Sequence, residues 1–148
     1  MKVFLAVILV ICGVLEQDVV SGSIGSWACI AGVTARYTFS RDGRCSLNQM
    51  QSSYNAMKQA NCRNCDKYFH CKGNYNAVYR CQRSSTNRRV AVAISNCREQ
   101  GQNSADSRAD QVANRYGRNG GNCESRYLCS YGCYYDPRSR RCSRSVCN

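Results

Sequence analysis

The chain has 148 residues, 13 of them cysteines, and a formal net charge of +12 at neutral pH. This length allows one small core, and a single histidine excludes hydrolytic sites that use a pair of histidines. The positive charge indicates anionic partners, although a basic surface that only keeps the protein soluble explains it equally well.

Residues 1–22 have the pattern of a secretory signal peptide. Lys2 precedes the apolar run Val3–Leu15, and small residues around Val20 and Gly22 suit a cleavage site. The apolar run is shorter than the ~20 residues that a membrane-spanning helix needs. We therefore expect a secreted, extracellular protein.

The cysteines that follow residue 22 are even in number, which predicts a disulfide framework in a short secreted chain. Leucine is nearly absent from the same region, so we expect the bridges to supply much of the stability. The cysteines expected to form disulfides are Cys29, Cys45, Cys62, Cys65, Cys71, Cys81, Cys97, Cys123, Cys129, Cys133, Cys142 and Cys147.

Residues 23–45 show no firm helical period. Small residues dominate the segment, and Tyr37 and Phe39 give only a short alternation. We predict an N-terminal loop segment, which a disulfide between Cys29 and Cys45 could close.

The first helix is predicted to begin at Ser46. Ser46 and Gln49 have the spacing of a capping box, in which each side chain accepts a hydrogen bond from the other residue's backbone N–H. Apolar residues then recur every three or four positions until the helix ends near Asn61. Its apolar face consists of Leu47, Met50, Tyr54 and Met57.

A second helix is predicted over Asp66–Cys81, where Tyr68, Cys71, Tyr75 and Val78 form one apolar stripe. The polar segment Gln82–Arg88 is predicted to be a linker.

A third helix follows this linker and is expected to end at Gly101. Its apolar face consists of Val90, Ile94 and Cys97. The fourth helix begins at Asp106 or Ser107, and Gly117 is its predicted C-cap. The residues on its inner face are Ala109, Val112, Ala113 and Tyr116.

Residues 119–148 form a basic tail with five cysteines, in which the residues Tyr135–Arg138 are predicted to turn. If all cysteines pair within the chain, an odd number of tail cysteines must bond outside the tail. An intermolecular bridge is the alternative.

Together, these elements predict an all-α fold: a small four-helix bundle over residues 46–118 with a disulfide-rich irregular C-terminal tail.

Catalytic and metal-binding patterns are weak in this sequence. Cys62 and Cys65 have a C-x-x-C spacing that zinc or redox sites use, but a disulfide fits an extracellular chain better. Glu99 and Glu124 are the only glutamates after residue 22, which is a poor basis for lysozyme-like chemistry. We expect no enzymatic activity, no cofactor and no bound metal.

Two stretches in fixed register carry a family resemblance. They comprise Asp66, Lys67, Tyr68, Phe69, His70, Gly73, Asn74, Tyr75 and Ala77, then Asp106, Ala109, Asp110, Gln111, Ala113, Asn114, Gly117 and Arg118. Over about Tyr54–Arg118 the chain resembles the serum amyloid A family of acute-phase apolipoproteins. Cysteines at Cys71 and Cys81 depart from that family's pattern.

The resemblance implies a non-catalytic secreted protein of acute-phase or innate-defence type. It implies that helices bind lipid, lipoprotein surfaces or small apolar ligands such as retinol, while arginines engage glycosaminoglycans or other polyanions. Homo-oligomers are possible, and no specific nucleic acid is expected. The corresponding ligand residues are Leu47, Met50, Tyr54, Met57, Val90, Ala93 and Ile94.

Two other interpretations of the residues stay open. The helical stripes fit an ordinary bundle core as well as they fit a lipid surface, and disulfides are expected to limit opening of the bundle. Tyrosine, arginine and dense cysteines also fit a structural protein of an extracellular matrix such as shell, mucus or adhesive. A direct antimicrobial polypeptide is a further alternative.

Overall fold

The computed structural model describes residues 24–60, 62, 65–128, 135–136, 138–139 and 141–142. The predicted signal peptide and the cysteines Cys129, Cys133 and Cys147 lie outside these residues. Five α-helices are described: α2 (Ile24–Tyr37), α3 (Arg41–Ala60), α4 (Asp66–Tyr79), α5 (Ser85–Arg98) and α6 (Ala105–Arg118). They confirm the all-α prediction.

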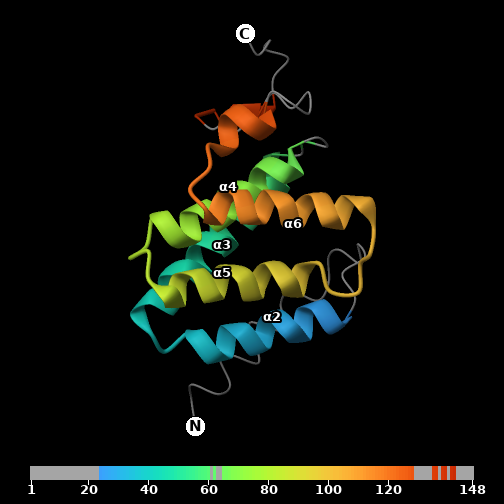
Figure 1. Cartoon of the computed structure of the whole chain (residues 1–148). Coiled ribbons are helices and arrows are strands. Elements are labelled where there is room, and N and C mark those ends of the chain that lie inside the picture. Colours follow the sequence, from blue (N-terminus) through green and yellow to red (C-terminus); the bar gives the residue numbers. More distant parts are fainter. Residues whose placement is uncertain are drawn as a thin grey trace.

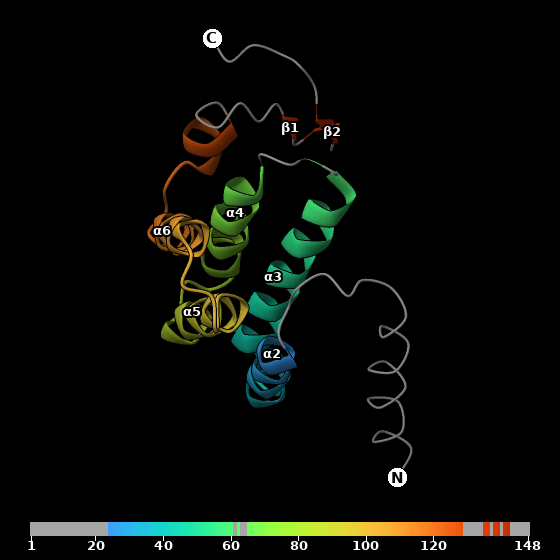
Figure 2. The same ribbon diagram turned by 90° about the vertical axis from the view of Figure 1, so that its right-hand side faces the viewer.

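The helices form two layers. Helices α2, α5 and α6 run side by side across Figure 1 and appear nearly end-on in Figure 2, where α3 and α4 cross them. The four predicted helices are α3 to α6, and α2 packs beneath α5 as an addition to that bundle. None of the described helices combines the length and apolar character needed to cross a bilayer.

The N-terminal segment corrects the sequence prediction, because residues 24–37 form helix α2 rather than a loop. Its inward residues Ser26, Cys29, Ile30 and Val33 are buried or half-buried. These positions do have helical spacing, but the outward residues Trp27 and Ala28 are apolar as well, so the sequence shows no contrast between an apolar and a polar face. The disulfide prediction was also wrong, since Cys29 bonds to Cys97 of α5.

Helix α3 begins at Arg41, five residues before the predicted start at Ser46. The backbone N–H of Gly43 donates to Ser40 Oγ at 3.0 Å, as at an N-cap. Ser46 is instead buried inside the helix, and its hydroxyl donates to the Ala77 carbonyl of α4 at 2.7 Å. A residue predicted to cap a helix therefore joins two helices.

Helix α5 starts inside the segment predicted to be a linker. Ser84 is its N-cap, with Ser84 Oγ accepting from the Asn87 N–H at 3.2 Å and Asn87 Oδ1 accepting from the Ser84 N–H at 3.0 Å. This capping box uses asparagine at its third position in place of the usual glutamate or glutamine. Asn87 is buried and also donates to Ser46 Oγ at 2.8 Å. The polar first turn of α5 therefore packs against α3 through hydrogen bonds, which is why its sequence resembles a linker.

Helix α4 is the central element, and its burial differs from the predicted single stripe. Polar Lys67, Asn74 and Asn76 are buried alongside the apolar Phe69 and Val78. The helix packs against α3, α5 and α6. A helix enclosed on several sides cannot show the one-sided periodicity of a surface helix.

Helices α4 and α6 approach most closely at Gly117. A Cβ at this position would overlap the backbone carbonyl of Cys71, so only glycine permits the observed distance between the helices. Gly117 therefore lies inside α6, which ends at Arg118 with Asn119 as its C-cap. The prediction of Gly117 as the C-cap is corrected.

Three described disulfides tie the helices together. They join Cys29 to Cys97, Cys45 to Cys81 and Cys71 to Cys123, and Cys62 is also disulfide-bonded. The bond from Cys123 to α4 confirms that the tail is attached covalently to the bundle.

The tail also packs on the bundle without covalent bonds. A π-helical turn, η1 (Glu124–Leu128), precedes the antiparallel two-residue strands β1 (Tyr135–Asp136) and β2 (Arg141–Cys142). The Tyr135 ring lies 4.9 Å from that of Phe69 of α4. The turn predicted over Tyr135–Arg138 lies later in the chain, because Tyr135 and Asp136 form β1 and the described turn residues are Arg138 and Ser139. The backbone N–H of Arg138 donates to Asp136 Oδ1 at 2.9 Å, and this hydrogen bond lowers the pKa of the Asp136 carboxyl.

Candidate functional site

The residues predicted to bind lipid or an apolar ligand belong to α3 and α5. Val90 is fully buried and Ile94 is 7% exposed, so both belong to the folded core. They can contact a ligand only if the bundle opens, and a ligand role for the set stays a prediction. The others, which are half-buried, are Leu47, Met50, Tyr54, Met57 and Ala93.

A small hollow lies where α3 meets α4. Met50, Tyr54 and Met57 of α3 line it together with Phe69 and His70 of α4. Its volume is about 30 Å³, room for about one water molecule. Sites for small organic ligands usually measure ~300–1,000 Å³, so this hollow does not hold an apolar ligand in the closed bundle.

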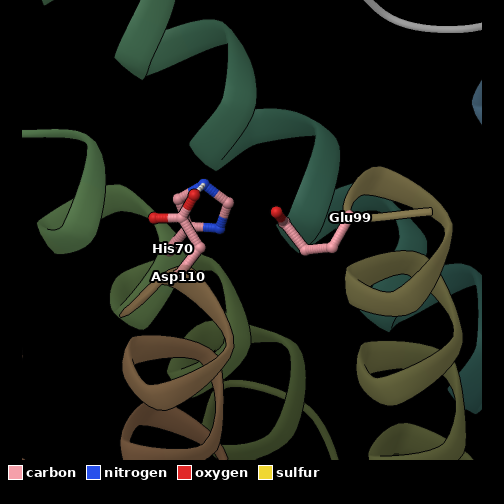
Figure 3. Close-up of side chains that lie close together, drawn as sticks. All are labelled: His70, Glu99 and Asp110. Atoms are coloured by element: carbon pink, nitrogen blue, oxygen red, sulfur yellow. Dashed lines mark ion pairs between the residues drawn. The ribbon is translucent and has the colours of Figure 1, made fainter. Parts of the chain in front are cut away.

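His70, the only histidine, projects from α4 toward α6 and the C-terminal end of α5 (Figure 3). Its Nδ1 lies 3.2 Å from Asn114 Oδ1, which also accepts from Asn74 Nδ2 at 2.8 Å. Because Asn114 Oδ1 is an acceptor, His70 Nδ1 carries the proton that is shared with it. Burial lowers the pKa of His70, although the Asp110 carboxylate acts in the opposite direction.

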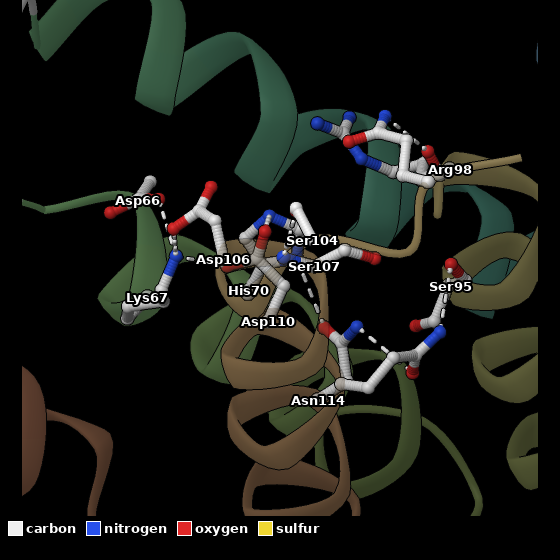
Figure 4. Close-up of polar contacts among 12 residues, drawn as sticks. Asp66, Lys67, His70, Ser95, Arg98, Ser104, Asp106, Ser107, Asp110 and Asn114 are labelled. Atoms are coloured by element: carbon white, nitrogen blue, oxygen red, sulfur yellow. Dashed lines mark hydrogen bonds and ion pairs between the residues drawn. The ribbon is translucent and has the colours of Figure 1, made fainter. Parts of the chain in front are cut away.

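Lys67 is a buried ammonium surrounded by carboxylates (Figure 4). Its Nζ lies 2.9 Å from Asp66 Oδ2, 2.5 Å from Asp106 Oδ1 and 2.6 Å from Asp110 Oδ1. Burial alone would lower the pKa of Lys67, but its hydrogen bonds to the three aspartates outweigh this effect and raise it above its ordinary value. The ion cluster joins the first turns of α4 and α6.

The residues of α4 and α6 that carry the family resemblance form hydrogen bonds with one another. Arg118 Nη1 donates to Asn74 Oδ1 at 2.7 Å, and Ser95 of α5 donates to the same oxygen at 3.1 Å. Burial lowers the pKa of Arg118. These residues hold α4, α5 and α6 together, so the stretches that gave the strongest sequence signal have a structural role.

The fold gathers arginines that are scattered in the sequence. The start of α3 and the end of α4 meet at the Cys45–Cys81 disulfide, and Asn87 of α5 donates to the Asp42 carbonyl at 2.8 Å. This end lies at the left of Figure 1. We call it the basic end and define it by the exposed residues Phe39, Arg41, Arg44, Arg80, Arg83, Arg88 and Arg89.

Asp42, in the first turn of α3, is the one acidic residue within the segments that make up the basic end, and most other described carboxylates pair with lysines elsewhere. Asp66, Asp106 and Asp110 surround Lys67, and Glu124 pairs with Lys72 at 2.9 Å. Across the described part of the chain, no arginine forms an ion pair with a carboxylate. The basic end is therefore a positive surface, with Phe39, 88% exposed, beside the arginines.

Comparison with known proteins places the fold in a family. A family model described as serum amyloid A protein matches residues 37–137. The chain is 40% identical over 107 residues to serum amyloid A-3 protein of Oryctolagus cuniculus, covering 66% of this chain and 85% of that protein. It is 34% identical over 121 residues to serum amyloid A protein of Canis lupus familiaris, covering 73% and 84%.

The chain is also 39% identical over 106 residues to serum amyloid A protein of Anas platyrhynchos, covering 64% of this chain and 81% of that protein. The family model extends beyond the resemblance over Tyr54–Arg118 in both directions and reaches into the tail. Helix α2 lies almost wholly before it. With the family model matching most of its length and the bundle of α3 to α6 carrying the shared residues, this chain belongs to the serum amyloid A family.

Proposed function

We propose that this protein is secreted, acts without catalysis in an acute-phase or innate-defence role, and binds anionic surfaces through its basic end. The observation that supports this proposal is the set of exposed arginines at the basic end, none of which forms an ion pair with a described carboxylate. Arginine favours contact with phosphate, sulfate and carboxylate groups because its guanidinium donates several hydrogen bonds in one plane.

An anionic lipid surface fits the basic end better than a purely ionic polymer does. Phe39 is 88% exposed and lies two residues before Arg41, and an exposed aromatic residue beside basic residues is typical of surfaces that lie on anionic membranes. The hollow beside Met50 and His70 is too small for an apolar ligand, which favours contact from outside the closed bundle. Glycosaminoglycans share the charge but offer no apolar phase for Phe39.

The test uses the oxidised, secreted protein and three probes: phosphatidylserine-containing vesicles, neutral vesicles and heparin. The basic-end variant is Arg41→Gln with Arg80→Gln. The matched control, Arg108→Gln with Arg138→Gln, removes the same charge from exposed positions elsewhere.

We expect binding to anionic but not neutral vesicles, measured by co-sedimentation at low salt. Each basic residue near an anionic membrane contributes ~1 kcal/mol, so the basic-end variant should bind about thirtyfold more weakly, and the control should bind almost as well as wild type. Equal weakening of both variants would contradict docking at the basic end. Failure to bind vesicles and heparin alike would reject the proposal, and binding to heparin alone would reassign the partner.

A further inference from the structure

His70, Glu99 and Asp110 meet at the end of α5 opposite the basic end. His70 lies on α4, Glu99 is the C-cap residue of α5, and Asp110 lies on α6. One donor atom from each lies within 4.8 Å of the other two, and Figure 3 shows the three side chains pointing toward one another. Residues distant in the sequence therefore form one cluster of nitrogen and oxygen donors.

The second nitrogen of the imidazole in this cluster forms no hydrogen bond with the described residues. His70 Nδ1 is occupied by Asn114 Oδ1, which leaves Nε2 with a lone pair directed toward Asp110 Oδ2 at 3.6 Å. This distance is too long for a hydrogen bond. The His70 side chain is only 10% exposed, and no described residue donates a hydrogen bond to Nε2. Two electron-rich atoms this close repel each other unless a positive group lies between them, either a proton on Nε2, which makes an ion pair with Asp110, or a metal ion.

We propose that His70 Nε2, Asp110 Oδ2 and the Glu99 carboxylate bind a divalent transition-metal ion of the Zn²⁺ type. Zinc binds histidine nitrogen and carboxylate oxygen at about 2.0–2.2 Å. Two ligands at tetrahedral positions are then about 3.4 Å apart, close to the 3.6 Å between Nε2 and Oδ2. Glu99 is half-buried at a helix end, so its flexible side chain can complete the set.

The outer contacts fit those of a metal site. Histidine ligands usually donate their second N–H to a carbonyl or carboxylate, and ligating carboxylates are themselves hydrogen-bonded. Here Asn114 accepts from His70 Nδ1, and Lys67 pairs with the second oxygen of Asp110 at 2.6 Å. The carbonyls at the C-terminal end of α5 add partial negative charge beside Glu99.

The surrounding charges also favour a dication. The carboxylates facing this region are those of Asp66, Asp106, Asp110 and Glu99, and the cations are those of Lys67 and Arg98. With neutral His70, a net charge of minus two remains in a strongly cationic protein. Lys67 already occupies the space among Asp66, Asp106 and Asp110, so the ion belongs on the His70 side of Asp110.

The experiment is a calorimetric titration of ZnCl₂ into the full oxidised protein, freed of metal with a chelator and then dialysed. Parallel ¹⁵N spectra of the imidazole report on His70 alone, because the chain has no other histidine. The variant is Glu99→Gln, at a half-buried position that leaves the core intact. The matched control is Glu124→Gln, which removes the same charge from the exposed Lys72 pair.

We expect one equivalent of Zn²⁺ to bind and to shift the Nε2 resonance while Nδ1 stays protonated. Loss of an outer-shell partner typically weakens metal binding 10- to 100-fold, so Glu99→Gln should weaken it at least about tenfold, with Glu124→Gln unchanged. An absence of binding, or Zn²⁺ binding that leaves His70 resonances in place, overturns the proposal. Equal affinity in both variants overturns it as well.

Discussion

At the residue scale, Lys67 shows how one polar side chain organises two helices. It is 6% exposed and pairs with the buried Asp110 as well as the more exposed Asp66 and Asp106. Removing the cation leaves the Asp110 carboxylate buried without its main partner. An unpaired buried charge costs far more than a lost surface ion pair.

Lys67→Met should therefore destabilise the protein by about 3–5 kcal/mol, measured by urea denaturation with the disulfides intact. Lys72→Met is the control, because its partner Glu124 is exposed and the pair contributes only ~0–1 kcal/mol. Since the aspartates raise the pKa of Lys67, its contribution is complete below about pH 10.4 and declines only above it. A cost below that of Lys72→Met would contradict this role.

Replacing Gly117 or Gly32 with alanine is expected to change the stability of the protein in opposite directions. Gly117→Ala forces a Cβ onto the Cys71 carbonyl and should destabilise the protein by ~1–3 kcal/mol or more. Gly32→Ala, in the exposed middle of α2, meets no atom within 4 Å and should stabilise by about 0.5–1 kcal/mol. Thermal unfolding of both variants checks the signs, and a neutral Gly117→Ala would show that α4 and α6 can separate.

At the element scale, α2 is the helix whose attachment depends most on a covalent bond. Ser26 is the one residue of α2 in the buried class among those with a described side chain, and Ile30, Val33 and Tyr37 are half-buried. The Cys29–Cys97 bond spans 68 residues and fixes α2 to α5. Since α2 lies almost wholly outside the family match, the bond joins an added helix to the shared bundle.

Replacing both Cys29 and Cys97 with serine should release α2 selectively. The chain-entropy model gives about 4 kcal/mol for a loop of this size, as an upper estimate of the lost stability. Hydrogen exchange should accelerate at the α2 amides while α4 and α6 stay protected. Replacing Cys45 and Cys81 is the comparison, and it should loosen the α3–α4 contact instead. Uniform acceleration throughout the double variant would show that α2 is integral to the core.

At the scale of the whole molecule, charge is separated along the bundle. The exposed arginines of the basic end lie where α3 begins and α4 ends. Asp66, Glu99, Asp106 and Asp110 gather near the start of α6 and the end of α5, where they outnumber the cations Lys67 and Arg98. An anionic surface should therefore orient the molecule and attract it by its basic end.

Fluorescence can test this orientation, because Trp27 is the only tryptophan and lies in the first turn of α2, away from the basic end. Phe39 is roughly 15–18 Å farther along, and interfacial side chains reach only ~5–10 Å into a membrane surface. Trp27 emission should stay unchanged on anionic vesicles. In the variant Trp27→Phe with Phe39→Trp, emission should shift to the blue. The reverse pattern would show that the α2 face lies on the membrane.

The sequence determined the fold class, the approximate positions of α3 to α6 and the family, because these depend on local periodicity and on residues in fixed register. It missed α2, because apolar residues such as Trp27 and Ala28 on the outward face hide the helical spacing of the inward residues, and it misplaced the helix starts that use Ser40 and Ser84. The cysteine count predicted a disulfide from the tail to another part of the chain, but it identified neither Cys123 nor Cys71 as the residues that form it.

Only the tertiary structure decided which distant residues act together. The basic end joins arginines from α3, from α5 and from the turn between α4 and α5, and His70, Glu99 and Asp110 come from three separate elements. Packing of α4 between its neighbours also decided that Val90 and Ile94 belong to the core rather than to an open lipid surface. Disulfide pairing and charge clustering depend on distances through space, and a one-dimensional pattern carries no information about those distances.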